Sequence, residues 1–146
     1  MSTYITHSEG ETEALGAAFA RRLPAGAVAA LYGDLGCGKT AFVRGMAQGM
    51  GLDQTQVSSP TFTIVNEYEG GPGQMPLFHF DMYRLGSADE LFDIGWEDYL
   101  GRGGVCAVEW SENVPGAFEG DEYAVRFRKT GETDREITVE GGPCLC

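Results

Sequence analysis

The chain has 146 residues and carries 22 Asp and Glu against 10 Lys and Arg, a formal charge of −12. Its length fits a single domain, and a hydrophobic content of 42% supplies a core without disulfide bonds. We therefore predict one domain over residues 1–140, followed by a flexible C-terminal tail at 141–146. Because nucleic-acid affinity comes largely from Lys and Arg that neutralise phosphates, so acidic a chain is not expected to bind tRNA or DNA directly.

The sequence has no apolar run near the ~18 residues of a membrane span, and its N-terminus lacks the basic-then-apolar pattern of a signal peptide. We expect a cytoplasmic protein without a membrane contact. Its four cysteines are then reduced thiols rather than a disulfide framework. Cys144 and Cys146 are too few for a structural zinc site, which takes about four ligands, so we place them in an inert tail.

The first third of the chain predicts a helix, a strand and a second helix. Residues 8–11, Ser-Glu-Gly-Glu, have the form of a capping box, and leucine or phenylalanine then recurs at every fourth position from 15 to 23. Residues 27–32 form a short apolar run, which is typical of a strand buried on both faces of a parallel sheet. The second helix is predicted over residues 39–50.

Patterning in the rest of the chain predicts two antiparallel hairpins, one more helix and one more buried strand. Residues 87–90 repeat the capping-box form and start the helix, and the apolar residues 105–108 end at Glu109. Turn residues separate the strands of each hairpin. The hairpin strands are 61–67 with 74–81, and 122–128 with 135–139. Together these elements predict an α/β fold with a mixed, mainly parallel sheet.

Residues 33–40, GDLGCGKT, fit the pattern G-x-x-x-x-G-K-[ST] and lie between a predicted strand and a predicted helix. Glycines let successive backbone N–H groups point at a phosphate, while Lys39 reaches the β- and γ-phosphates and Thr40 ligates Mg²⁺. The alternative is a glycine-rich turn that matches by accident, but the flanking strand and helix favour binding of a nucleoside triphosphate. The residues expected to contact the nucleotide here are Asp34, Gly36, Cys37, Gly38, Lys39, Thr40 and Ala41.

Two carboxylates follow predicted buried strands and are candidates to anchor the metal. Asp81 ends one strand and Glu109 ends another. Because open α/β sheets bind ligands at the carboxyl ends of their strands, both acids can converge on one crevice. The alternative for each is a solvated loop charge.

Other polar residues carry weaker indications. Residues 58–62, Ser-Ser-Pro-Thr-Phe, follow the second helix, and their hydroxyls either reach the γ-phosphate and its water or form a simple turn. Arg44 and Arg84 are candidate charge stabilisers, although most arginines here suit a soluble surface. His7 and His79 have no second His or Cys at ligand spacing, so we predict that neither binds a metal.

Several longer motifs then resemble one family. GDLGCGKT, VSSPTFTIVNEY, FHFDMYRL, ELFDIGWEDYL and VEW occur in the order and spacing of the bacterial tRNA threonylcarbamoyladenosine biosynthesis ATPases, the TsaE family. The resemblance covers residues 11–110, and beyond them only the last hairpin and Arg135 correspond. It implies a P-loop NTPase-like three-layer fold and an ATPase that uses ATP and Mg²⁺.

The resemblance also implies roles for residues. Lys39 and Thr40 would act on phosphate and Mg²⁺, Glu109 would be a metal ligand, and Asp81 would lie beside nucleotide and metal. Thr61 falls in a segment that resembles a nucleotide-sensing switch. Three further residues would lie near the base or ribose: Glu9, Glu112 and Arg135.

Family members bind a heterodimer of two related subunits, one of which holds the tRNA-modifying site. By resemblance, this chain would support threonylcarbamoyl transfer to the adenosine beside the anticodon and would meet tRNA only through those partners. We expect slow ATP hydrolysis by the chain alone, because no arginine is clearly placed to stabilise the transition state.

Cys37 departs from the family, which commonly has a small apolar residue at this position of the loop. The slot contributes mainly a backbone N–H, so the phosphate contact is expected to survive. A thiol at a helix N-terminus is also expected to have a lowered pKa and to react readily in the empty protein.

Three rival functions remain at this point. A small-molecule kinase shares the phosphate loop but needs an arginine-rich lid, and the nearest arginine cluster, Arg126 and Arg128, lies in a predicted strand. A GTP-dependent switch lacks support, because no Asn-Lys-x-Asp motif occurs and residues 82–84 contain no glycine. A nucleotide-gated interaction module without physiological hydrolysis is equally compatible with the sequence.

Overall fold

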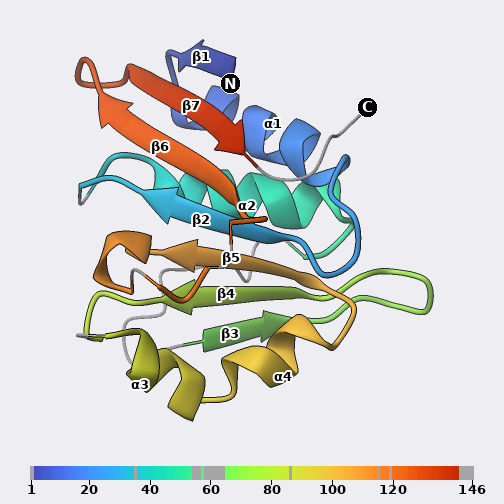
Figure 1. Ribbon diagram of the computed structural model, residues 1–146. Helices are drawn as coiled ribbons and strands as arrows, with labels where there is room; N and C mark the ends of the chain where they lie inside the picture. Colours follow the sequence, from blue (N-terminus) through green and yellow to red (C-terminus); the bar gives the residue numbers. More distant parts are fainter. Residues whose placement is uncertain are drawn as a thin grey trace.

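A computed structural model describes residues 2–34, 36–53, 57, 65–85, 87–114, 116–118 and 120–141. Its elements run in the order β1, α1, β2, α2, β3, β4, α3, α4, β5, η2, β6 and β7 (Figure 1). The strands are β1 (Ser2–Thr6), β2 (Val28–Tyr32), β3 (Val65–Tyr68), β4 (Leu77–Asp81), β5 (Val105–Glu109), β6 (Tyr123–Lys129) and β7 (Arg135–Gly141). The helices are α1 (Glu9–Ala20), α2 (Lys39–Gly49), α3 (Ala88–Asp93), α4 (Trp96–Leu100) and the short 3-10 helix η2 (Ser111–Asn113).

The seven strands form one sheet in the order β1-β7-β6-β2-β5-β4-β3. Strands β6, β2, β5 and β4 run parallel in the middle, while β3 at one edge and the β7–β1 pair at the other are antiparallel to their neighbours. The α/β class, the mixed sheet and both predicted hairpins are thus confirmed. The sheet is only partly parallel, because half of its six strand pairs are antiparallel.

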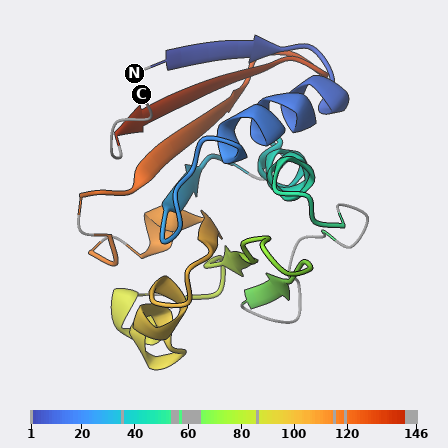
Figure 2. The same cartoon turned by 90° about the vertical axis from the view of Figure 1, so that its right-hand side faces the viewer.

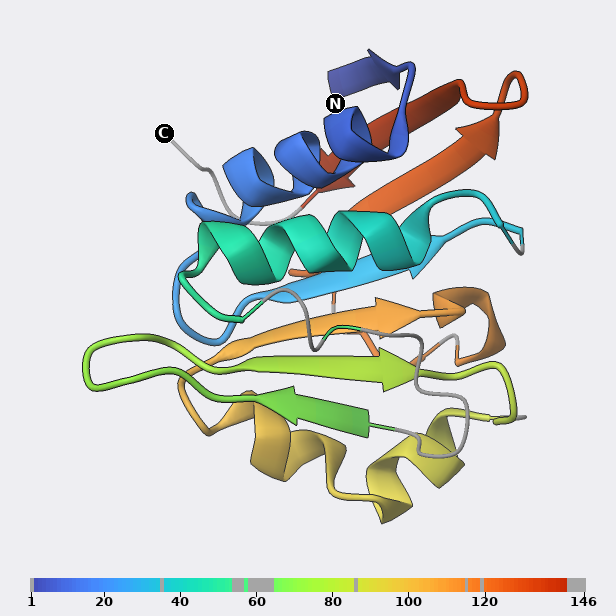
Figure 3. The ribbon, with the colours of Figure 1, turned by 180° about the vertical axis from the view of Figure 1, so that it is seen from behind.

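Helices lie on both sides of this sheet (Figures 2 and 3), with α1 and α2 on one face and α3 and α4 on the other. Alternation along β5 explains the two cores. Val105 and Ala107 face the cluster that contains residues of α1 and α2, whereas Cys106 and Val108 face the cluster that contains Trp96 of α4. Both faces of the central strands are therefore buried, as their continuous apolar sequences predict.

Helices α1 and α2 pack with their backbones almost in contact. A Cβ atom placed on Gly45 of α2 would lie 1.8 Å from the carbonyl oxygen of Glu13 in α1, and one on Gly16 would lie 2.2 Å from the carbonyl oxygen of Phe42. Only glycine permits this approach, because a side chain would collide with backbone rather than with a movable group. The close crossing brings the start of α1 next to the phosphate-loop helix.

The two capping-box sequences behave differently. Ser8 caps α1, and its Oγ accepts the N–H of Glu11 at 3.1 Å, while the Glu11 carboxylate accepts the N–H of His7 at 2.9 Å. Ser87 precedes α3 without a side-chain cap hydrogen bond. In that six-residue helix the motif marks the first residue, but the Ser87 side chain does not form the hydrogen bond of a capping box.

The structure adds elements that the sequence patterns do not predict. Strand β1 pairs with β7 from the opposite end of the chain, and α4 follows α3 after a short break. Strand β7 includes Gly141, the first residue of the predicted tail, while Cys144 and Cys146 lie outside the described residues. Across the described chain, every helix is too short or too polar to cross a membrane.

Candidate functional site

The phosphate loop connects β2 to α2 as the motif predicts. Gly33, Gly36 and Gly38 all have positive φ, at 147°, 77° and 101°, and Gly38 is the N-cap of α2. L-residues with side chains rarely adopt these values, so glycine lets the chain turn sharply into the helix. The N-terminus of α2 therefore lies just after the carboxyl end of β2, and a helix N-terminus with free N–H groups is an arrangement that binds anions.

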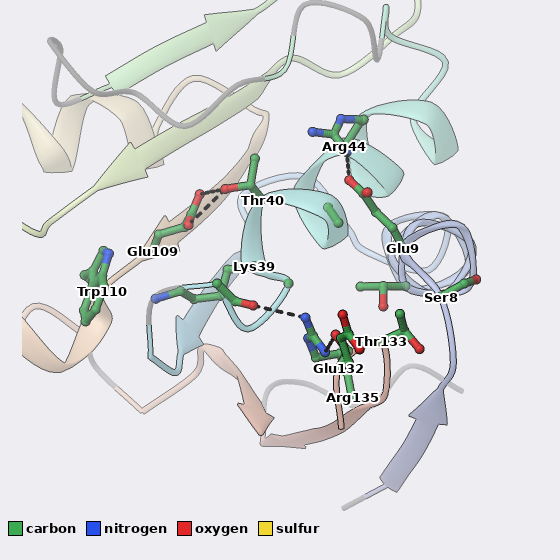
Figure 4. Close-up of a pocket in the computed structure, with 14 residues that line it drawn as sticks. Ser8, Glu9, Lys39, Thr40, Arg44, Glu109, Trp110, Glu132, Thr133 and Arg135 are labelled. Atoms are coloured by element: carbon green, nitrogen blue, oxygen red, sulfur yellow. Dashed lines mark hydrogen bonds and ion pairs between the residues drawn. The ribbon is translucent and has the colours of Figure 1, made fainter. Parts of the chain in front are cut away.

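A cavity of about 440 Å³ opens beside this loop (Figure 4). Its walls come from the start of α1, the loop, the first turns of α2, the end of β5 and the turn between β6 and β7. That volume lies within the range of small-molecule and cofactor sites. The predicted site residues that line it are Glu9, Gly36, Gly38, Lys39, Thr40, Ala41, Glu109 and Arg135.

Other predicted residues have different places. Asp34, Cys37, Asp81 and Glu112 stay outside the lining of this cavity in the described chain. Glu112 instead accepts the N–H of Gly33 at 3.3 Å and so supports the start of the loop from η2. Thr61 and the rest of the predicted switch segment lie outside the described residues.

Thr40 and Glu109 meet across the sheet end. The Thr40 hydroxyl lies 3.3 Å from Oε2 and 3.5 Å from Oε1 of Glu109. Glu109 is only 3% exposed, so its carboxylate needs polar partners inside the protein. A hydroxyl and a carboxylate facing one another provide the oxygen donors that Mg²⁺ prefers.

Asp81 lies opposite Glu109 on the neighbouring parallel strand. Burial raises the pKa of the Asp81 carboxyl, and the nearby Glu109 carboxylate raises it further, while the N–H of Tyr83, 2.9 Å from Oδ1, acts in the opposite direction. The two acids therefore converge as the strand-end argument predicts. Thr40, however, contacts Glu109, which makes Glu109 the acid nearer to the phosphate loop.

His79 belongs to the same group of side chains, although the sequence analysis assigned it no role. It is fully buried in β4, and its Nε2 is hydrogen-bonded to Oε2 of Glu109. Its position two residues before Asp81 was the available indication, because residues two apart on a strand face the same side of the sheet. Within the described part of the chain, no cluster of three or more His, Cys, Asp or Glu side chains forms a metal site.

Lys39 does not point into an open phosphate site. It is 4% exposed, its Nζ donates to the carbonyl oxygen of Gly33 at 2.5 Å, and the same nitrogen lies 3.7 Å from the ring centroid of Trp110 (Figure 4). Trp110 has a φ of 59°, a value uncommon for a residue other than glycine. The loop lysine is therefore held by a carbonyl and an aromatic ring, a contact that the sequence analysis missed.

Arginines and acids surround the other end of the cavity. The Arg135 guanidinium donates to backbone carbonyls of the β6–β7 turn at 2.9–3.3 Å and to the Gly36 carbonyl at 3.2 Å, so it connects that turn to the phosphate loop. Arg44 of α2 pairs with Glu9 at 2.9 Å and with Glu13 at 3.0 Å. Both arginines that line the cavity are thus held by acceptors within the protein.

The expectation of a reactive Cys37 is wrong. Its side chain is 2% exposed and packs in the core, and this burial raises the pKa of the thiol despite the opposing effect of Lys39. The helix N-terminus is therefore not the dominant influence on this side chain. Cys106 is also free and buried, and burial raises its pKa to about 12.

Comparisons with known proteins identify the family of this chain. The family model described as "Threonylcarbamoyl adenosine biosynthesis protein TsaE" matches residues 6–137. The tRNA threonylcarbamoyladenosine biosynthesis protein TsaE of Treponema pallidum is 41% identical over 137 residues, which cover 92% of this chain and 97% of that protein. The TsaE protein of Bacillus subtilis is 40% identical over 128 residues, which cover 88% of this chain and 78% of the Bacillus subtilis protein.

A solved structure extends the similarity to three dimensions. The crystal structure of Bacillus subtilis YdiB superposes with a TM-score of 0.78 at 32% identity and covers 97% of this chain and 86% of that one. The resemblance inferred from the motifs is confirmed by both kinds of comparison. The chain belongs to the TsaE family of threonylcarbamoyl adenosine biosynthesis proteins.

Proposed function

We propose that this chain is the Mg²⁺-dependent ATPase of tRNA threonylcarbamoyladenosine synthesis and acts with a heterodimer of two related modification subunits. The observation that carries the proposal is the contact between the Thr40 hydroxyl and Oε2 of Glu109, which lie 3.3 Å apart. Both residues line a cavity whose wall also includes the first turn of the phosphate-loop helix. The pathway is inferred from family membership, and the ATPase chemistry is inferred from the residues of the site.

The donor set fits a magnesium ion bound together with a nucleotide. Mg²⁺ is usually held by one or two protein oxygens, with phosphate oxygens and water in its remaining positions. Thr40 and Glu109 would hold it, and Asp81 would contact its water shell from the neighbouring strand. Mg²⁺ bound there would neutralise negative charge on the β- and γ-phosphates.

The chain's own residues would divide the remaining work. Backbone N–H groups at Gly38 to Ala41 would bind the phosphates, and Lys39 would leave Trp110 to reach the β- and γ-phosphates. Glu9 and Arg135, at the far end of the cavity, would flank the base or ribose. Glu112 would act indirectly, through its hydrogen bond to Gly33.

A partner requirement follows from the arginines. Arg44 and Arg135 are paired with acidic side chains and backbone carbonyls, so either would have to leave these partners to stabilise charge on a transferring phosphate. Such an arginine contributes about 10³–10⁵ in kcat. The missing charge, or an ordering of the segment around Thr61, would come from the partner subunits, which also hold the tRNA.

The test is steady-state phosphate release from ATP, with and without the purified partner heterodimer. The isolated chain should be slow, and partners should raise turnover at least about tenfold, with Lys39→Ala inactive in both cases and Thr61→Ala losing the stimulation. Turnover near ~10 s⁻¹ for the chain alone, unchanged by partners, would identify a self-sufficient enzyme instead. Tight ATP binding with no release in either case would favour an interaction module.

A further inference from the structure

His79 occupies a position where an apolar side chain would be expected. It is fully buried at the centre of β4, where its neighbours across the sheet are Ala107 of β5 and Asn66 of β3. Along the same face of β4 it follows Leu77 and precedes Asp81. The imidazole therefore lies two residues before the strand end at which Asp81 and Glu109 are paired, on the side of the sheet that α2 covers.

Packing alone does not account for an imidazole in this position. Its Nδ1 has no hydrogen-bond partner among the described residues, although a buried ring nitrogen normally finds one. A leucine would fill similar space without leaving a polar atom unpaired. Among the described residues, the hydrogen-bond partner of the imidazole lies on its other nitrogen.

That other nitrogen, Nε2, contacts Oε2 of Glu109, the same oxygen that lies 3.3 Å from the Thr40 hydroxyl. The carboxylate is thus held between β4 and α2, and it is only 3% exposed. Ligand side chains are commonly oriented by such outer partners. Without His79, the Glu109 carboxylate would keep, among the described residues, the long contacts to Thr40.

We propose that His79 is a positioning residue that fixes the Glu109 carboxylate against Thr40 and thereby presets the magnesium end of the site. The proposal rests on the function proposed above, because it requires that Thr40 and Glu109 hold the Mg²⁺ of Mg·ATP. It concerns the orientation of one carboxylate and assigns no metal contact to His79 itself.

The experiment compares ATP affinity in EDTA with ATP affinity in excess Mg²⁺, and the ratio of the two measures metal coupling without any catalytic readout. His79→Leu removes the hydrogen bond at similar volume, and His79→Gln restores a donor near the Nε2 position. His79→Asn is the polar control, because its shorter amide does not reach Glu109. Phe80→Leu disturbs the neighbouring core on the opposite face of β4.

His79→Leu and His79→Asn should lower the Mg²⁺ enhancement of ATP affinity about 10-fold to 100-fold, the usual effect of losing an outer partner. Their affinity for ATP in EDTA should stay within about twofold of wild type. His79→Gln should recover most of the enhancement. Phe80→Leu should lower the melting temperature and leave the enhancement unchanged.

An unchanged Mg²⁺ enhancement in folded His79→Leu would overturn the proposal, as would equal losses in His79→Gln and His79→Asn. If none of the three His79 variants folds, the residue serves the core and the proposal is wrong. A wild-type protein without any Mg²⁺ enhancement would instead contradict the magnesium site itself. Failure of the positioning role is therefore distinguishable from failure of the proposed function.

Discussion

The two ends of the phosphate site differ in how complete they are. At the metal end, Glu109 contacts both Thr40 and His79. At the lysine end, Lys39 is bound to the Gly33 carbonyl and lies over Trp110. At one end the contacts of the proposed magnesium site are thus formed, whereas at the other end the proposed phosphate contact would require Lys39 to leave its present partners.

Burial explains both states. A buried charge needs a partner, and Glu109 and Lys39 are among the few buried charged side chains described. Glu109 finds its partners in Thr40, which would also hold the metal in the proposed function, and in His79. Lys39 finds its partners in a carbonyl and an aromatic ring, and in the proposed function phosphates would displace it from them.

Glu109→Gln should have the largest effect, because it removes the charged ligand of the proposed magnesium site. The change keeps the shape of the side chain but removes its charge, so Mg²⁺-dependent ATP hydrolysis should fall about 100-fold, since metal stabilisation is worth several kcal/mol. ATP affinity in EDTA should change little. Calorimetry and phosphate release on the same samples test this, and an equal loss with and without Mg²⁺ would indicate a folding defect instead.

Arg135→Gln should weaken the attachment of the β6–β7 turn to the phosphate loop and so destabilise the loop that carries Lys39. Its guanidinium connects the β6–β7 turn to Gly36, and loss of those bonds should cost about 1–3 kcal/mol in the free energy of unfolding. For a domain of this size, the melting temperature should drop by roughly 3–8 °C. Arg128→Gln is the matched control, because the exposed pair of Arg128 with Glu136 should contribute little. Equal melting of the two variants would refute this role of Arg135.

Trp110→Phe should ease the movement of Lys39. Phenylalanine holds a cation less strongly than tryptophan, and a difference of about 0.5–1 kcal/mol would tighten ATP binding in EDTA two- to fivefold. Trp96→Phe is the control, since Trp96 packs against Phe80 and Phe118 on the other face of the sheet. Weaker binding in Trp110→Phe than in the control would show that the ring contacts the nucleotide rather than retaining the lysine.

The smallest effect concerns His7, an exposed residue that precedes Ser8 of the cavity wall. Its Nδ1 lies 3.0 Å from Asp134, and this hydrogen bond raises the pKa of the imidazole. Stability from the pair is therefore present below the unfolded pKa of His7 and is lost as the pH rises through the folded value. NMR titration should show the pKa of His7 falling towards 6.5 in Asp134→Asn. An unchanged value would exclude the pair in solution.

Local patterns predict much of this molecule. The strand, glycine loop and helix around Lys39 follow from adjacent residues, and Asp81 and Glu109 converge because parallel strands end at one edge of a sheet. The capped start of α1 is equally local. Each of these features depends on residues within a few positions or on a general rule of topology.

Features that depend on distant partners were missed or wrong. Strand β1 is an exposed edge strand whose pairing partner, β7, lies at the other end of the chain. The resting contact of Lys39 with Trp110 requires both residues in their final places. The thiol of Cys37 was judged by its helix terminus, whereas packing against distant core residues dominates its pKa.

The central claim is that this cavity binds ATP through Lys39, and calorimetric titration of ATP into wild type and Lys39→Ala tests it directly. A charge-assisted hydrogen bond of about 1.5–3 kcal/mol predicts at least a tenfold loss of affinity, with and without Mg²⁺. The only other lysine in the sequence, Lys129, is the last residue of β6 and lies outside the lining of the cavity. Wild type should also prefer ATP to GTP. Equal ATP affinity in the two proteins would contradict the account.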